Sequence, residues 1–221
     1  GCQFVKYWLH NAYIMIDKEK MSKSLGNFMT VRDIRKKFNP LVLRFFLLSA
    51  HYRSPINFSK EGLDQAQSAL ERINNCYSDL KFAAANREPC ERDTGLASAV
   101  EKASLGYREA MDDDFNTAGG LGCVFDVVRA VNVHLTENDG FCEDGIMAAK
   151  NFLESVNCVF GFLSEDKGCS SDEDIDALLE ERANSRKNKD FRRSDEIRDM
   201  LAEKGIIIED TPQGARWKRQ I

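Results

Sequence analysis

A short polar segment near the start of the chain, DKEKMSKSLGN at residues 17–27, has the residue types of a phosphate-binding loop. Lys20 and Lys23 stand three residues apart, and Ser22 and Ser24 supply two hydroxyl groups beside them. Lysine carries a compact charge and three donors on a flexible stem, and a glycine two residues after Ser24 allows a tight turn. Such a loop could close on a polyphosphate and stabilise the charge that develops on departing pyrophosphate. Spacing alone leaves an exposed turn as the alternative.

Charge is distributed unevenly along the 221 residues. The chain has a net charge of −5, but residues 1–60 carry +8 and the remainder carries −13. Further basic residues gather at 182–198 and 216–219. Basic regions near both ends predict contact with a polyanion at two separated places, and solvated helix faces are the alternative. We find no run of about 18 apolar residues, so we expect no membrane partner.

Residues 1–58 are expected to place the polar loop among short extended pieces and helices. The stretch from 29 to 38 has helical spacing. Asn39 followed by Pro40 predicts the start of another helix, because Asn can cap and Pro suits the first turn. The residues that follow are apolar nearly all round, which predicts a buried helix.

Residues 59–164 are predicted to form an antiparallel helical bundle. Ser59 and Thr117 are candidate helix caps, and Asp112 to Asp114 are expected to fix the helix entry before Thr117 by capping. Glycines at 119, 120 and 122 should weaken that helix by about 1 kcal/mol each where they are helical. The expected helices cover about 59–85, 95–111, 117–136 and 144–163.

Residues 165–221 are predicted to form a small α+β unit of two helices and a β-hairpin, after a linker at 164–174. Ser170 and Glu173 have the spacing of a capping box, and Asp190 can cap the second helix. The three parts together predict a mainly α chain.

The string KMSKS followed by LGN resembles the second signature of class I aminoacyl-tRNA synthetases. Four further stretches in the expected order are similar to the cysteinyl-tRNA synthetase family: NFMTVRD, RFFLLSAHYRSPINFS, EAMDDDFNT and IIIEDTPQGARWKR. The resemblance covers essentially the whole chain. It implies a ligase of protein biosynthesis that attaches cysteine to tRNA(Cys) through a cysteinyl-adenylate. It also implies that residues 1–58 are the end of a catalytic nucleotide fold.

The resemblance assigns roles to the polar loop. Lys23 inherits contact with ATP, and Lys20 assists it, so both are the expected catalytic residues. ATP is expected to bring Mg²⁺ with it. The expected ATP-binding residues are Lys20, Met21, Ser22, Lys23 and Ser24.

The resemblance also implies two contacts with tRNA. Unstacked anticodon bases can be held by aromatic faces, guanidinium planes and base-edge hydrogen bonds. Phe191 could instead pack between Leu179 and Ile197, and Asp210 could merely cap its turn. The expected tRNA backbone contacts are Arg32, Arg35, Lys36 and Lys37, and the expected anticodon contacts are Arg186, Phe191, Asp195 and Asp210.

Two features of the family have no counterpart in this sequence. The first signature, of the His-x-Gly-His type, is absent, and His10, His51 and His134 are the only histidines. The seven cysteines form no C-x-x-C pair, and Cys76, Cys123 and Cys158 are expected to be buried hydrophobes rather than zinc ligands. We therefore expect the first signature and the zinc upstream, in an amino-terminal half, and no catalysis by this chain alone.

We further expect a monomer in the cytoplasm. Two other functions are open on this sequence: a non-enzymatic tRNA-binding module, and a synthetase-like ligase that couples cysteine to a small amine. An intact phosphate loop argues against the first function. The unit beyond residue 164 argues against the second, because such ligases resemble only the catalytic part.

Overall fold

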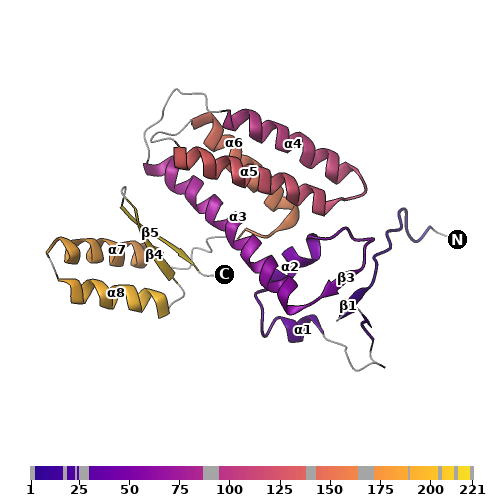
Figure 1. Ribbon diagram of the computed structural model, residues 1–221, viewed down its shortest axis with the longest axis horizontal. Helices are drawn as coiled ribbons and strands as arrows, with labels where there is room; N and C mark the ends of the chain where they lie inside the picture. Colours follow the sequence, from indigo (N-terminus) through magenta and orange to yellow (C-terminus); the bar gives the residue numbers. More distant parts are fainter. Residues whose placement is uncertain are drawn as a thin grey trace. The chain divides into compact units, whose positions relative to one another are not determined.

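The computed structural model describes residues 3–16, 19–22, 24, 30–86, 95–137, 143–163, 172–188, 190–203, 206–211 and 214–219. The chain folds into two compact units, residues 1–163 and residues 164–221. Helices dominate the described residues, and strands form one three-stranded and one two-stranded sheet there. The predicted fold class, mainly α with a helical bundle and a small α+β unit, is confirmed (Figure 1).

The first unit begins with a small sheet in the order β2-β1-β3. Strand β1 (Ile14–Ile16) pairs antiparallel with β2 (Glu19–Lys20) and parallel with β3 (Ile56–Phe58). Helices α1 (Val31–Ile34) and α2 (Pro40–Leu48) lie between β2 and β3 in the chain. The parallel strands β1 and β3 need a crossover connection, and β2, α1 and α2 form it. The polar segment therefore lies at the beginning of this connection.

Helix α1 is shorter than the helix predicted over 29–38. Its N-cap is Thr30, and turns rather than helix follow it from Arg35. The chain cannot continue as one helix because Pro40 disfavours helical geometry at the residue before it. Asn39 instead caps the next helix, since its Oδ1 accepts a hydrogen bond from the N–H of Leu41 at 2.9 Å. The predicted start of α2 is thus confirmed, and Val42, Leu43, Phe45 and Phe46 on that helix are buried.

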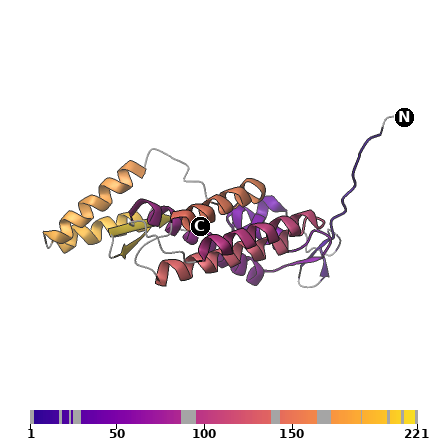
Figure 2. The same cartoon turned by 90° about the horizontal axis from the view of Figure 1, so that it is seen from above.

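Four longer helices complete the unit: α3 (Lys60–Asn86), α4 (Leu96–Asp112), α5 (Thr117–Glu137) and α6 (Glu143–Phe160). Helix α4 packs on α5 and α6, and α3 packs on α2, α5 and α6. Figures 1 and 2 show α4, α5 and α6 side by side. One face of α3 lies in the core, where Leu63, Leu70 and Ile73 are fully buried.

Helix α5 is long and apolar enough to cross a membrane by length and composition alone. Its valines 124, 127, 128 and 131 are fully buried in the bundle, so its apolar character is that of a core helix. Its cap differs from the prediction: the Oδ1 atom of Asn116, not the Thr117 hydroxyl, accepts a hydrogen bond from the N–H of Gly119 at 2.9 Å.

The second unit comprises α7 (Asp172–Lys187), α8 (Phe191–Glu203) and the hairpin of β4 (Ile206–Thr211) and β5 (Gly214–Arg219). The predicted cap is confirmed, since the Arg193 N–H donates to Asp190 Oδ1 at 3.2 Å. Ser170 of the expected capping box lies outside the described residues. The core of the unit consists of Ile175, Leu179, Ile197, Leu201 and Ile206.

Candidate functional site

The polar segment predicted to bind phosphate begins at a tight strand pair. Met15 of β1 pairs with Lys20 of β2, and the Met21 N–H donates to the Ile14 carbonyl oxygen at 3.1 Å. Lys20 is exposed, and its Nζ atom lies 5.5 Å from the centre of the Tyr13 ring. A cation at this distance from an aromatic face is attracted to it. The strand pair and the Tyr13 ring together set the position of Lys20.

Two hydroxyl groups of the segment lie together. The Oγ atoms of Ser22 and Ser24 are 3.2 Å apart and share a hydrogen bond. Met21 and Ser22 are half-buried, and Ser24 is exposed. Lys23, the residue expected to contact ATP, lies outside the described residues. In the described part of the segment, one exposed ammonium and two adjacent hydroxyls have the chemistry of anion-binding groups.

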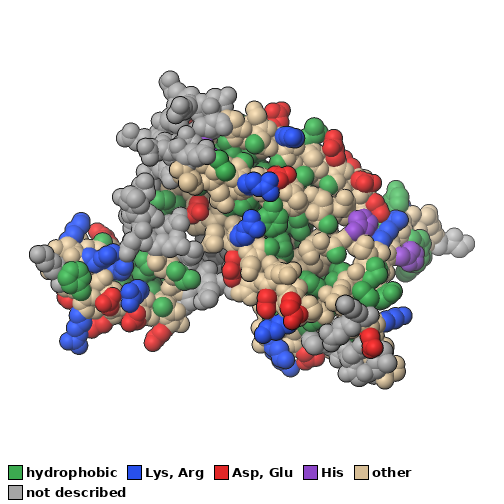
Figure 3. Space-filling model, viewed as in Figure 1, with side chains coloured by type: hydrophobic (Ala, Val, Ile, Leu, Met, Phe, Trp, Pro, Cys, Tyr) green, Lys and Arg blue, Asp and Glu red, His purple; other side chains and the backbone are tan. Residues whose placement is uncertain are grey.

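Helix α1 and the turn after it carry the four residues predicted to contact a tRNA backbone. All four are exposed: Arg32, Arg35, Lys36 and Lys37. Lys36 pairs with Asp33 at 3.3 Å, and hydrogen bonds from Thr30 and then Lys36 lower the pKa of Asp33. Figure 3 shows Lys and Arg side chains at the lower edge of this unit, with acidic side chains beside them. The exposed cations suit solvent-accessible phosphates better than a buried ligand.

The loop between α4 and α5 reaches the segment after α2, which the sequence did not predict. The hydroxyl of Tyr52 donates to Oδ1 of Asp114 at 2.7 Å, and Nε of Arg53 lies 3.0 Å from the other carboxylate oxygen. Nε of His51 is 3.8 Å from the same oxygen. Asp114 therefore contacts the 51–53 segment rather than capping α5, and the capping role predicted for Asp112 to Asp114 is wrong for this residue.

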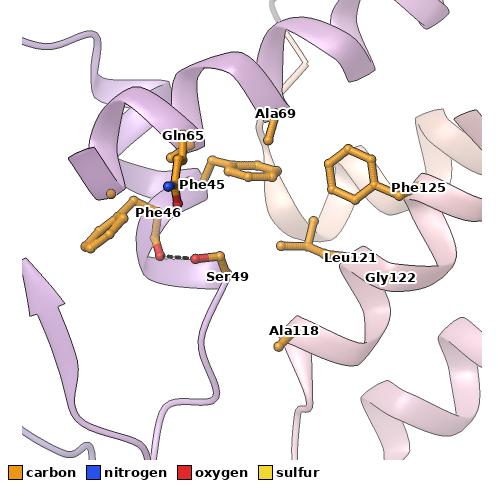
Figure 4. A pocket seen from close by; sticks show the side chains of 11 residues that line it. Phe45, Phe46, Ser49, Gln65, Ala69, Ala118, Leu121, Gly122 and Phe125 are labelled. Atoms are coloured by element: carbon orange, nitrogen blue, oxygen red, sulfur yellow. Dashed lines mark hydrogen bonds between the residues drawn. The ribbon is translucent and has the colours of Figure 1, made fainter. Parts of the chain in front are cut away.

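A groove in the first unit lies between α2, α3 and α5. Its volume is about 430 Å³. Figure 4 shows Phe45 on α2 and Leu121 and Phe125 on α5 directed into it, with Ala118 and Gly122 on the same side of α5. Figure 3 shows hydrophobic side chains gathered in the middle of this unit. The residues that line the groove are mainly small or apolar: Phe45, Phe46, Ser49, Gly62, Gln65, Ala66, Ala69, Ala118, Leu121, Gly122 and Phe125.

The predicted anticodon residues lie in the second unit. Arg186 lies in the last turn of α7 and Phe191 is the first residue of α8, so both lie at the same end of this helix pair. Asp195 is one helical turn after Phe191 and lies 3.6 Å from Arg198. Asp210 pairs with Ala215 in the hairpin, and its side chain lies outside the described part of the chain.

Phe191 is not a packing residue. Its side chain is 62% exposed, whereas Leu179 and Ile197 are 8% and 0% exposed. The core formed by the described residues of the unit does not include it. The alternative that placed Phe191 between these two residues is therefore wrong.

The described residues contain no cluster of side chains with the composition of a metal site. Over that part of the chain, no group of three or more His, Cys, Asp or Glu side chains could hold a metal ion. Cys76 is buried, but Cys123 is only half-buried and Cys158 is exposed, so two of the three cysteines expected in the core are not there. Residue 158 faces outward because Val156 and Phe160 occupy the buried side of α6.

Three family models match successive parts of the chain. Residues 1–68 match the tRNA synthetases class I (C) catalytic domain, and residues 106–164 match the DALR domain. Residues 170–217 match the cysteinyl-tRNA ligase anticodon binding domain. Strands β1 to β3 and the KMSKS segment therefore belong to a class I aminoacyl-tRNA synthetase fold, and the second unit corresponds to an anticodon-binding domain.

Individual relatives show which family within the class I synthetases the chain resembles. A protein of Lysinibacillus sphaericus (strain C3-41) named cysteine–tRNA ligase is 47% identical over 98% of this chain and 46% of its own length. A protein of Oceanobacillus iheyensis with the same name is 47% identical over 99% of this chain and 47% of its own. The chain belongs to the cysteine–tRNA ligase family. It spans about half the length of these curated relatives.

One solved structure shares the fold at low identity. The LeuRS of Agrobacterium radiobacter K84, in the ternary complex LeuRS–tRNA–LeuAMS, matches with a TM-score of 0.51 and 18% identity. The match covers 65% of this chain and 19% of that one. At this identity the similarity concerns the fold alone.

Proposed function

We propose that this chain takes part in the ATP-dependent attachment of cysteine to tRNA(Cys), as part of a cysteine–tRNA ligase. The observation that carries the proposal is the order of the three synthetase family matches, with the KMSKS segment intact directly after β2. In this reaction the cysteine carboxylate attacks the α-phosphate of ATP, which gives cysteinyl-adenylate and pyrophosphate. A terminal ribose hydroxyl of the tRNA then takes the cysteinyl group and releases AMP.

The KMSKS segment would act on the first step. Negative charge grows on the departing pyrophosphate, and cations that meet this charge only in the transition state raise the rate of the step. Lys23 would supply this contact and Lys20 would assist, with the Ser22 and Ser24 hydroxyls as further donors. The pairing of β1 with β2 supports this role for Lys20, because it holds the residue at the start of the segment.

Mg²⁺ and zinc enter the proposal only through the complete enzyme. Mg²⁺ usually arrives bound to substrate phosphates and neutralises their charge. The described residues hold no group that fits a metal ion, so we assign zinc no ligand among them and derive no step from it. Any zinc site is expected in the part of the relatives that this chain does not span.

The second unit and the α1 region would contact the tRNA. Arg32, Arg35, Lys36 and Lys37 would bind backbone phosphates, and such contacts position the nucleic acid without reading its sequence. Phe191 would stack on an anticodon base, and Arg186, Asp195 and Asp210 of the same unit would supply further contacts. We propose residues 1–58, 59–164 and 165–221 as catalytic, bundle and anticodon domains, in a monomeric cytoplasmic protein.

A chimaera tests the enzymatic role. This chain replaces the matching 46% of the Lysinibacillus sphaericus relative, and ATP–pyrophosphate exchange and aminoacylation are measured. We expect both activities, and Lys23→Ala should lower kcat for exchange by about 100-fold. The matched control is Lys102→Ala, which removes an exposed lysine of α4. A folded chimaera that binds tRNA but does neither reaction would favour the non-enzymatic binding module.

The chain by itself tests tRNA recognition. Fluorescence anisotropy compares a tRNA(Cys) transcript with one that carries another anticodon, and equal affinities would refute the anticodon assignment. Phe191→Leu removes a ring face that Phe191→Tyr keeps, so only the first change should weaken binding, by about 1–3 kcal/mol. Because Phe191 is exposed, circular dichroism should show that both variants keep their helices.

A further inference from the structure

The carboxylate of Asp114 is the centre of a closed set of polar contacts. Tyr52 Oη donates to it at 2.7 Å, and Arg53 approaches both of its oxygens, at 3.0 and 3.3 Å. Nε of Arg53 also donates to Tyr52 Oη at 2.9 Å. The hydrogen bond to Tyr52 and the charge of Asp114 raise the pKa of Arg53. Three side chains from two loops thus hold one another.

The backbone at Asp114 adopts an unfavourable conformation. Asp114 and Phe115 have φ values of 55° and 54°. Few residues other than glycine adopt this left-handed region, and they persist there only where their surroundings require it. The left-handed pair ends α4 and leaves the Asp114 carboxylate in contact with Tyr52.

The backbone of Tyr52 is hydrogen-bonded to the residues that precede β1 and the KMSKS segment. Its carbonyl oxygen accepts from the Ala12 N–H at 2.8 Å, and the next pairing joins Ile56 N–H to the Tyr13 carbonyl at 3.4 Å. Strand β1 follows, with its contact from Ile14 to Met21. Tyr13 also provides the ring under the Lys20 ammonium. Separate hydrogen bonds, joined by the covalent backbone between them, therefore connect Asp114 to Met21 at the start of the polar segment.

We propose that Asp114 is a positioning residue for the KMSKS segment, acting through Tyr52 and β1. The inference has two halves. The catalytic half, that Asp114 affects the rate of the reaction, rests on the proposed function. The structural half, that Asp114 positions the segment, depends on this chain alone. The α4–α5 loop of the bundle, rather than the sheet alone, sets where Lys20 and the residues after it lie. Loss of the contact should loosen the segment without unfolding the bundle.

Hydrogen exchange on the 221-residue chain tests the structural half. Tyr52→Phe removes only the hydroxyl, and Asp114→Asn removes the charge but keeps a residue that tolerates left-handed φ. In both variants the Ala12 and Met21 amides should exchange about tenfold faster, with core amides of α5 unchanged. Asp113→Asn, the same change at an exposed neighbour, should alter neither. Unchanged exchange at both amides, or equal acceleration throughout α5, would overturn the proposal.

The chimaera tests the catalytic half. Misplaced reacting groups lower the rate of the chemical step, so Tyr52→Phe should lower kcat for ATP–pyrophosphate exchange by about tenfold or more and leave tRNA affinity within about twofold. A merely structural role would lower kcat and tRNA affinity together through loss of folded protein, and that result would overturn the inference. An inactive wild-type chimaera would instead contradict the proposed function and leave the exchange result standing.

Discussion

Three glycines in the first turns of α5 should respond differently to the same change, replacement by alanine. Gly122 is exposed, and a Cβ atom added there would meet nothing within 4 Å. In a helix interior alanine is more stable than glycine by about 0.8–1.0 kcal/mol. Gly122→Ala should therefore raise the free energy of unfolding of the first unit by about that amount. Figure 4 shows why there is space: the residue borders the groove between α2, α3 and α5.

Gly120 should behave in the opposite way. A Cβ atom there would lie 3.2 Å from two atoms of the Tyr107 ring and 3.5 Å from Phe160. The Tyr107 ring already meets Phe152 and Phe160 edge to face, with ring centres 6.0 and 5.8 Å apart, so it has little freedom to move. Overpacking of this kind costs about 1–3 kcal/mol and outweighs the helix gain. We expect Gly120→Ala to be destabilising by up to about 2 kcal/mol.

Gly119 lies between these cases. Its added Cβ would come within 2.8 Å of the Asn116 side chain, which caps the helix. Displacement of the cap costs about 1 kcal/mol, which offsets the gain in helix propensity. Gly119→Ala should leave stability nearly unchanged.

Urea unfolding and the exchange of the slowest α5 amides measure all three variants. Both methods report on the unit that contains α5. In thermal unfolding, a change of 1 kcal/mol would shift the Tm of a unit of this size by about 2–4 °C. The expected order of stability is Gly122→Ala, then wild type and Gly119→Ala together, then Gly120→Ala. Equal stabilisation by Gly120→Ala and Gly122→Ala would refute the reasoning, because helix propensity alone would then explain both.

Three further predictions concern α3 and α6. Asn157 Oδ1 accepts from the N–H groups of Phe162 and Leu163 at 2.9 and 2.8 Å, so Asn157→Ala should lower the free energy of unfolding by about 1–3 kcal/mol, measured in urea. Burial, and then Asp79, raise the pKa of the Cys76 thiol to about 12 from 9.0. Above pH 9 only the unfolded thiol ionises, so stability should fall by up to about 1.4 kcal/mol per pH unit towards pH 12, and Cys76→Ala should remove this part of the slope. At pH 8 a thiol reagent should label Cys158 in the folded chain and spare Cys76, as peptide mass spectrometry can establish.

Local signals in the sequence predicted most of the helices. Asn39, Ser59 and Asp190 each cap the helix that follows, because a cap needs only a side-chain oxygen and an N–H two or three residues later. The wrong prediction of Thr117 as the cap of α5 also concerned a local signal. Asn116 and Thr117 are both capping residues, and the sequence does not say which of two neighbours adopts the non-helical backbone.

Contacts between distant segments could not be predicted in this way. The run Asp112 to Asp114 looks uniform in the sequence, yet it is Asp114 whose carboxylate contacts Tyr52, 62 residues earlier in the chain. The choice depends on the left-handed turn at Asp114 and on the packing of α4 against α5. Neither leaves a periodic or capping signal.

Phe191 shows how the structure excludes one of two interpretations of a residue, since its exposure rules out the packing role and leaves base stacking as a proposal. The sequence allowed either a packing role or a base-stacking role, because a phenylalanine at the start of a helix suits both. Burial of a phenylalanine side chain is worth about 1.5–3 kcal/mol relative to leaving it exposed, and Phe191 forgoes most of that gain at 62% exposure. The ring therefore contributes little to the fold of its unit. Binding of a partner with a flat apolar face would recover this free energy, and an unstacked base presents such a face.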